Sequence, residues 1–269
     1  RFAALPGTSC IQRVAANQWE FPDGSVLVQT LSLPQSDVDR STPQRIETRL
    51  LTKQAGVWAG YSYMWNSAQD DALLVPADGM ELRLPVVGAL SGDAEAKAPT
   101  WKVPSRTDCM SCHSRAANFV LGLNELQADC TVNHGGIEIH QLRALWERNL
   151  IDKRIPARSE VPMRLVNPYD SSRDLEARAR SYLHVNCSVC HVAAGGGNSR
   201  MLLNLEQKRE EMQLVEVFPQ HQSFGLPLAM LVAPGHPERS VLYHRMSWRG
   251  PGQMPPRGTH VVDQVAVQL

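Results

Sequence analysis

A five-residue motif, Cys-x-x-Cys-His, occurs twice in this chain, as CMSCH at residues 109–113 and as CSVCH at residues 187–191. Cysteine pairs with this spacing also occur in zinc ribbons and in redox dithiols. A zinc ribbon places its two pairs about 15–20 residues apart, whereas residues 113–186 separate these two pairs. A redox dithiol does not need the histidine that follows each pair, and no βαβ pattern surrounds either copy. Zinc and dithiol chemistry are therefore disfavoured.

The remaining chemistry is covalent attachment of a c-type haem, for which this motif is typical. Two cysteines three residues apart on one helical turn can each form a thioether with a vinyl group of the same porphyrin. The histidine that follows then lies under the iron as its proximal ligand. The sequence thus predicts two covalently attached haem c groups. The predicted haem-binding residues of the motifs are Cys109, Cys112, His113, Cys187, Cys190 and His191, with His113 and His191 as iron ligands.

Charge and hydropathy exclude two other classes of function. The 269 residues include 27 Lys and Arg against 27 Asp and Glu, so the formal net charge is zero. A chain without a basic field gives no reason to expect a nucleic-acid partner. No apolar run approaches the roughly 18–20 residues of a membrane-spanning helix, so we expect no membrane span in this chain.

Two cysteines, Cys10 and Cys130, lie outside the motifs. Haem attachment through Cys-x-x-Cys-His ordinarily takes place outside the cytoplasmic membrane, so we expect a periplasmic or exported protein. Disulfides form in that oxidising compartment. The sequence leaves open whether Cys10 and Cys130 pair, because it does not fix the distance between their Cα atoms.

The distribution of β-prone and helix-prone segments predicts an α+β protein. A β-rich N-terminal domain, a sandwich or a barrel, is expected ahead of a mainly α-helical C-terminal domain. The expected strands are residues 25–33, 45–51, 56–66 and 81–87. Residues 94–104 have the composition of a linker. The expected parts are a β-rich domain at residues 1–104, a first haem-binding segment packed on it at 105–170, and the mainly α-helical domain at 171–269.

Helices are expected where apolar residues recur at spacings of three and four, at residues 136–150, 171–186 and 261–269. Asp170, Ser171 or Ser172 can serve as N-cap of the helix that enters the second motif. The three glycines at residues 195–197 allow a tight loop where the backbone passes close to the haem.

Residues 171–269 resemble a class I cytochrome c domain. They contain an entering helix, Cys-x-x-Cys-His, a Met-Pro-Pro segment at residues 254–256 and a closing helix. The resemblance implies that Met254 is the distal iron ligand of the second haem. A thioether is a soft ligand that favours reduced iron, and the two prolines stiffen the loop. Met246 is the main alternative.

The whole chain also resembles a group of exported bacterial dihaem c-type cytochromes without an assigned reaction. The stretches that carry this resemblance are residues 21–32, 45–51, 101–114, 118–127 and 234–256.

The distal position of the first haem stays open at this point, because no Met-Pro-Pro segment follows the first motif before residue 171. The candidate ligands are His134, His140, Met163, Met64 and Met80, and five-coordinate iron is the remaining alternative. Four arginines lie close in sequence to the motifs or to Met254. Each either pairs with a haem propionate or faces solvent as an ordinary surface arginine. They are Arg106, Arg115, Arg200 and Arg257.

The preferred function is electron transfer between a periplasmic donor and a periplasmic acceptor protein through the two haems, because no catalytic acid–base constellation stands out. One alternative is a haem enzyme, in which an open first haem acts on peroxide or a nitrogen oxide and the second haem relays electrons. Another is a redox-sensing or protein-docking module. The large β-rich region keeps both alternatives open.

Overall fold

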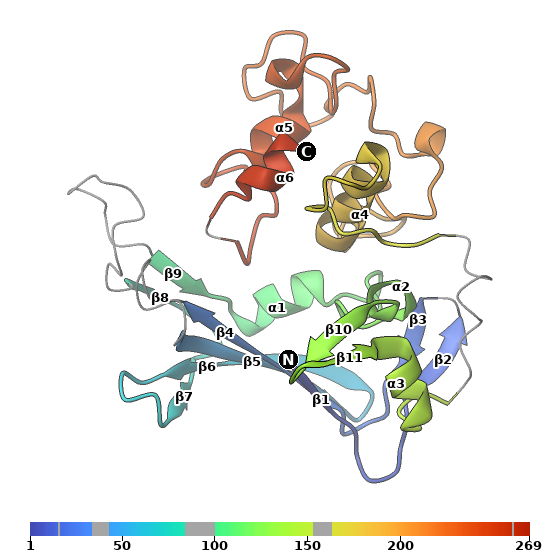
Figure 1. The fold of residues 1–269 in the computed structure, drawn as a ribbon. Helices are drawn as coiled ribbons and strands as arrows, with labels where there is room; N and C mark the ends of the chain where they lie inside the picture. Colours follow the sequence, from blue (N-terminus) through green and yellow to red (C-terminus); the bar gives the residue numbers. More distant parts are fainter. Residues whose placement is uncertain (16, 34–42, 84–99, 153–162, 260) are drawn as a thin grey trace. The chain divides into compact units, whose positions relative to one another are not determined.

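The computed structural model describes residues 1–15, 17–33, 43–83, 100–152, 163–259 and 261–269, which form an α+β structure (Figure 1). The strands are β1 (Phe2–Ala4), β2 (Gln12–Ala15), β3 (Gln18–Glu20), β4 (Val26–Leu33), β5 (Gln44–Gln54), β6 (Val57–Trp65), β7 (Ala72–Leu74), β8 (Met80–Arg83), β9 (Thr100–Val103), β10 (Thr131–His134) and β11 (Ile137–His140). The helices are α1 (Arg106–Cys112), α2 (Glu125–Ala128), α3 (Gln141–Glu147), α4 (Leu175–Cys187), α5 (Val241–Met246) and α6 (Gln264–Gln268), with 3₁₀ turns η2 (Arg209–Glu211) and η3 (Pro237–Arg239).

The chain divides into two compact units. The first comprises Arg1–Gln12 and Glu20–Ser111, and the second comprises Arg13–Trp19 and Cys112–Leu269. The first motif lies at the boundary in the chain, and the second motif lies wholly within the second unit. The three-part division expected from the sequence stays a prediction.

The first unit is built on an antiparallel five-stranded sheet in the order β1-β4-β5-β6-β7. Strands β4, β5 and β6 form its centre, in the places where the sequence predicts strands at residues 25–33, 45–51 and 56–66. Gln54 pairs with Val57, so Ala55 and Gly56 form a two-residue hairpin loop, and both have positive φ (49° and 75°). This is the backbone of a type I′ turn, whose twist matches that of the strands it joins.

One carboxylate is completely buried in this unit. Glu47 on β5 is 0% exposed and accepts hydrogen bonds from Ser62 Oγ (2.9 Å), Trp101 Nε1 (3.0 Å) and Arg49 Nε (2.7 Å). A buried charge is tolerated when it is paired and hydrogen-bonded in this way. We therefore assign Glu47 a structural role that ties β5, β6 and β9 together.

Two expectations for this unit lie partly outside the described residues. Of the expected strand at 81–87, residues 81–83 belong to β8, and residues 84–87 are outside the described part of the chain. Of the expected linker at 94–104, residues 94–99 are likewise outside it. The prediction of a linker at 100–103 is wrong, because these residues form β9 and pair with β8.

The prediction of a helix at residues 136–150 is also wrong for the first part of this range. Residues 137–140 form β11, which pairs with β10 through a two-residue loop of Gly135 and Gly136, and only Gln141–Glu147 is helical. Both glycines have positive φ (61° and 88°). A Gly-Gly pair is a strong signal for a tight hairpin turn, so the residues that follow it begin a strand here and not a helix.

The second unit has its own apolar core next to the longest helix, α4. Buried Met201, Leu203, Met212, Leu214 and Leu231 form this core, and Leu183 and Cys187 of α4 pack against it.

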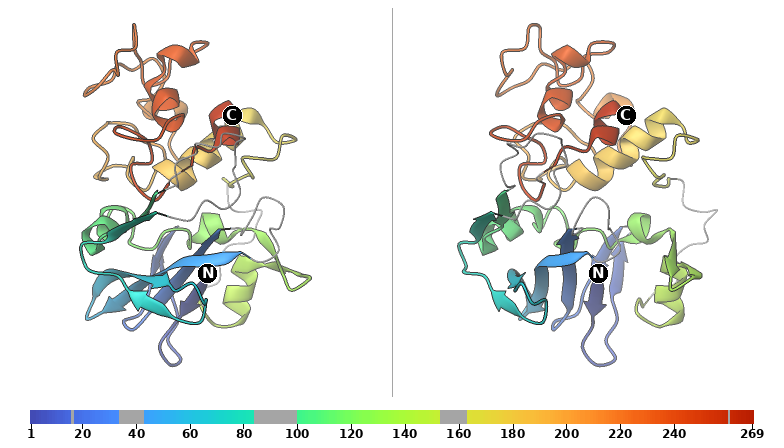
Figure 2. Two further views of the ribbon diagram at one scale, coloured as in Figure 1. Left: turned by 90° about the vertical axis from the view of Figure 1, so that its left-hand side faces the viewer. Right: turned by 60° about the vertical axis from the view of Figure 1, so that its left-hand side comes forward.

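The two other predicted helices are present in this unit with shorter bounds, as α4 and as the C-terminal helix α6. Both views of Figure 2 show α4, in yellow, beside α6, in red. Tyr169 Oη donates a 2.7 Å hydrogen bond to Asp263 Oδ2, and Asp263 is the N-cap of α6. These contacts hold the C-terminal segment against the region that precedes the second motif.

None of the helices in the described part of the chain combines the length and the apolar character that a bilayer crossing demands.

Candidate functional site

The second motif follows directly from α4. The N-cap of this helix is Asp174, whose side chain accepts from Ala177 N at 2.9 Å, so the helix begins later than the predicted caps at residues 170–172. The helix ends at Cys187, and the carbonyl of Cys187 then accepts from Cys190 N (3.1 Å) and His191 N (3.0 Å). This tight turn continues the helical path and keeps the three motif side chains close together.

All three side chains line one cavity of about 470 Å³, which we call the large cavity. Its volume lies in the range of small-molecule and cofactor sites. Its apolar lining includes Met201, Leu203, Leu231 and Leu242.

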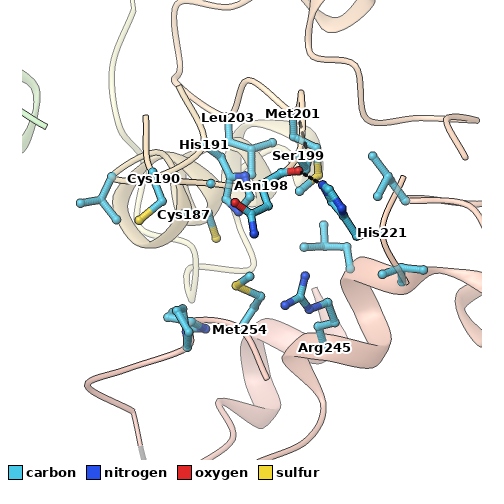
Figure 3. Close-up of a pocket in the computed structure, with 18 of the residues that line it drawn as sticks. Cys187, Cys190, His191, Asn198, Ser199, Met201, Leu203, His221, Arg245 and Met254 are labelled. Atoms are coloured by element: carbon cyan, nitrogen blue, oxygen red, sulfur yellow. Dashed lines mark hydrogen bonds between the residues drawn. The ribbon is translucent and has the colours of Figure 1, made fainter. Parts of the chain in front are cut away.

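Met254 lines the same cavity. Figure 3 shows Cys187 and Cys190 at one end of the cavity, His191 on one wall and Met254 on the facing wall. The structure thus brings together the three motif residues and the methionine that the sequence singled out.

His191 is 6% exposed, and its surroundings favour the neutral imidazole. Burial, and then the positive charge of Arg245, lower the pKa of His191 below its ordinary value. Its Nδ1 is buried and has no hydrogen-bond partner among the described residues. The neutral imidazole is the form in which histidine binds a metal.

The glycine run after the motif packs against the motif itself. A Cβ atom on Gly197 would lie 2.7 Å from His191 Nδ1 and 2.9 Å from its Cε1, and one on Gly195 would lie 2.2 Å from the Cys190 carbonyl oxygen. Neither glycine needs a positive φ. Glycine is required at both positions by close approach rather than by backbone conformation.

We expect Gly197→Ala to displace the His191 ring and to lower the free energy of unfolding by about 1–3 kcal/mol, the usual cost of overpacking. Urea unfolding followed by circular dichroism measures this. Gly225→Ala is the control, because a Cβ there meets nothing within 4 Å, although φ is +71°. The control should lose only about 1 kcal/mol from its backbone conformation. If both variants lose the same free energy of unfolding and the environment of His191 is the same in both, the proposed clash between the new Cβ at residue 197 and the His191 ring is wrong.

The loop that carries Met254 is fixed by hydrogen bonds to α5. Met254 N donates to the carbonyl of Arg245 (2.9 Å), and Arg245 Nε donates to the carbonyl of Gly252 (2.7 Å). Gln253 Nε2 donates to the carbonyls of Pro255 (3.1 Å) and Thr259 (3.3 Å). The thioether is therefore presented by a loop with defined backbone contacts.

Met246, the alternative to Met254, is the last residue of α5. It lines a second, smaller cavity together with Tyr182, Cys187 and Met254. Met254 lines both cavities, whereas Met246 is absent from the lining of the large cavity, where His191 lies. Burial raises the pKa of Cys187 to about 12, and burial, followed by the negative charge of Asp263, raises the pKa of Tyr182 to about 12.

The first motif begins on α1. Ser105 Oγ accepts from Asp108 N (2.9 Å), and the Asp108 carboxylate accepts from Ser105 N (3.2 Å). This reciprocal pair is a capping box, which fixes the start of the helix. A Cβ atom on Gly60 of β6 would lie 2.6 Å from Cys109 Cβ. Cys109 therefore rests directly on the backbone of the sheet.

His113 is held in one tautomer by the turn that follows it. Its Nδ1 lies 2.6 Å from the carbonyl oxygen of Phe119. Because a carbonyl only accepts, Nδ1 carries the proton and Nε2 keeps its lone pair. The turn needs positive φ at Asn118 (53°) and Phe119 (59°), and Asn118 Nδ2 donates to the Trp19 carbonyl at 2.8 Å. Positive φ at a bulky residue such as Phe119 is strained and is retained where the surroundings demand it.

The residues that the sequence suggests as distal ligands of the first haem, opposite His113, differ in exposure and in hydrogen bonding. His140 is already engaged on both nitrogens, since Nε2 lies 3.1 Å from Asp129 Oδ1 and Nδ1 accepts from Arg143 N at 3.4 Å. His134 is exposed on the β10–β11 hairpin, and Met80 is 41% exposed. Met64 on β6 and Met163 are partly buried.

The cysteines outside the motifs, Cys10 and Cys130, are free thiols in the structure. Cys130 Sγ lies 3.5 Å from the Gln127 carbonyl and 3.6 Å from Gln141 Oε1. Two motif cysteines of the second unit contact each other. A hydrogen bond between Cys190 and Cys112 is the main cause that raises the pKa of Cys190, and burial is the next. Cys112 also lines the large cavity.

Sequence reasoning missed Arg245, which lines the large cavity and braces the Met254 loop. Its place in the chain ahead of the Met-Pro-Pro segment carries no signal by itself. The role of Arg245 depends on how that loop returns to α5, which the sequence does not show.

No protein-family model, curated protein or solved structure matches this chain.

Proposed function

We propose that this chain is a dihaem c-type cytochrome that passes electrons between redox partners. The observation that carries the proposal is the large cavity, where Cys187, Cys190 and His191 meet Met254 from the facing wall (Figure 3). Two thiols, an imidazole and a thioether form the donor set of a covalently attached, six-coordinate haem. The proposal assigns Cys187 and Cys190 to the thioether bonds and His191 and Met254 to the iron.

The side chains present fit such a group. His191 is buried, burial lowers its pKa, and its buried Nδ1 has no partner among the described residues. The lining of the cavity is largely apolar, which suits a porphyrin face. A bound haem would supply one-electron redox chemistry. The chain's residues would exclude water, hold the ligands in place and set the reduction potential through the axial ligand, burial and hydrogen bonding.

The first motif supports a second haem, held by Cys109, Cys112 and His113. The Phe119 carbonyl fixes His113 with its proton on Nδ1, which leaves Nε2 as the ligand atom. Cys112 and Cys190, one from each motif, are in contact with each other. This contact favours electron exchange between groups bound at the two motifs, as a relay requires.

The proposal includes a location and partners. Covalent attachment retains a haem outside the cytoplasmic membrane, so we infer a periplasmic or exported protein, with a donor and an acceptor protein as partners. The β-rich N-terminal domain as a sandwich or barrel, and the class I cytochrome c character of residues 171–269, remain parts of this proposal.

One observation favours the alternative of a haem enzyme. The hydrogen bonds of His140 to Asp129 and Arg143 occupy both of its ring nitrogens, which removes one candidate for the distal position of the first haem. An open position there would let that iron bind a small molecule such as peroxide or a nitrogen oxide.

The absorption spectrum of the purified protein, oxidised and reduced, tests both functions. A relay should show low-spin haem in both sites and the weak far-red band of a methionine–iron bond, and the reduced protein should not bind carbon monoxide. If half of the haem is high-spin and binds carbon monoxide, the first site is open and the enzyme is the better assignment. Absence of covalently bound haem rules out both.

A further inference from the structure

The large cavity contains a cation that the sequence did not single out. Arg245 on α5 lines it, and Figure 3 shows its guanidinium directed into the cavity. Its Nε donates to the Gly252 carbonyl (2.7 Å), and its guanidinium carbon lies 5.5 Å from the centre of the Phe224 ring. Within the described part of the chain, no carboxylate forms an ion pair with it. Arg245 is thus a half-buried cation without an anionic partner there.

Burial lowers the pKa of Arg245, as expected for a charge that has lost part of its hydration. A charge in such a place is costly unless an anion compensates it. An arginine fork matches the geometry of a carboxylate and binds it through two parallel hydrogen bonds. The cavity therefore has a built position for a carboxylate that the chain itself does not supply among its described residues.

The position of Arg245 relative to the cysteines indicates which carboxylate this is. Figure 3 shows Arg245 and His221 on the side of the cavity away from Cys187 and Cys190. In a c-type haem the thioethers lie on the vinyl edge of the porphyrin, and the two propionates lie on the other edge. Resting on the proposed function, we propose that Arg245 binds a propionate carboxylate of the second haem and keeps a positive charge beside its iron.

Arg245 also braces the loop of the distal ligand. Its backbone carbonyl accepts from Met254 N (2.9 Å), while its side chain holds the Gly252 carbonyl. One residue thus connects the propionate edge with the Met254 loop. Its positive charge stabilises the reduced haem, which carries one positive charge less at the iron. Loss of the charge should therefore lower the reduction potential.

The test uses the purified holoprotein and the variants Arg245→Gln and Arg245→Lys. Arg245→Gln should lower the equilibrium constant for reduction of the methionine-ligated haem about tenfold, or about 59 mV for one electron. It should also shift the propionate bending band in the resonance Raman spectrum. Arg245→Lys keeps the charge and should restore most of the potential, which a purely structural role would not predict.

Two further arginines make the test specific. Arg239→Gln is the matched control, because Arg239 donates to the Leu228 carbonyl in an exposed region and does not line the large cavity. Arg257→Gln removes another arginine of the cavity lining. The proposal is overturned if Arg245→Gln leaves the potential and the propionate band unchanged, or if only Arg257→Gln shifts them. A wild-type protein without covalent haem overturns the proposed function and this inference together, whereas an unaltered Arg245→Gln holoprotein overturns the inference alone.

Discussion

Replacing Cys187 and Cys190 together with serine should reduce the covalently bound haem from two groups per chain to one. A serine hydroxyl forms no thioether with a vinyl group, and α4 would still end in the same tight turn. The far-red band of the Met254–iron bond should be lost, because Met254 faces the second motif. Mass spectrometry of the intact chain and the haem absorbance per chain measure the loss.

The chain offers matched controls for this experiment. The double variant of Cys10 and Cys130 to serine removes the same number of thiols outside the motifs, and it should keep two haems. The double variant of Cys109 and Cys112 should also keep one haem, but with the methionine band intact. Two haems in either motif variant would mean that the cysteines do not attach the cofactor.

The sequence predicted the elements whose signals are local. The central strands β4, β5 and β6 follow from β-prone runs of the right length, and the α+β class follows from them and from the helices. The start of α4 was predicted too early because several residues before Leu175 can cap a helix, and tertiary contacts decide among them. Asp174 is the one whose side chain reaches the third amide of the helix, at Ala177.

Other features depend on contacts between residues far apart in the chain. Glu47 is stabilised by groups on β6 and β9, and Trp101 is 54 residues away. Such partners have no local pattern, so the sequence could not distinguish Glu47 from a surface carboxylate. The β10–β11 hairpin is different, because its Gly-Gly pair is a local signal for a turn, whereas the helical spacing of the apolar residues that follow predicts a helix instead.

The two motifs also combine features that are local in the sequence with features that depend on distant contacts. The spacing within Cys-x-x-Cys-His is local chemistry and could be read directly from the sequence. The facing position of Met254, the contact of Cys112 with Cys190 and the brace by Arg245 arise only when distant segments fold together. The residue types of the candidate site were thus predictable, whereas its geometry and its charge were not.

Met254→Ala should open the second haem, and Met246→Ala should leave it closed. Removing the thioether leaves one iron position for an added ligand, so the reduced Met254→Ala protein should bind carbon monoxide at one haem per chain. The reduction potential should fall by on the order of 0.1 V, within the about 0.8 V range that axial ligands control. The methionine band of the second haem should disappear.

Met246→Ala tests the alternative ligand on the same helix–loop segment. Met246 lines the smaller cavity and is absent from the lining of the large one, so truncation should create a void in the smaller cavity and reduce the free energy of unfolding by about 2 kcal/mol. The methionine band and the lack of carbon monoxide binding should persist, because the large cavity keeps both His191 and Met254. If instead the band vanishes in Met246→Ala and persists in Met254→Ala, Met246 is the iron ligand. The segment that carries Met246 must then move to place its thioether opposite His191.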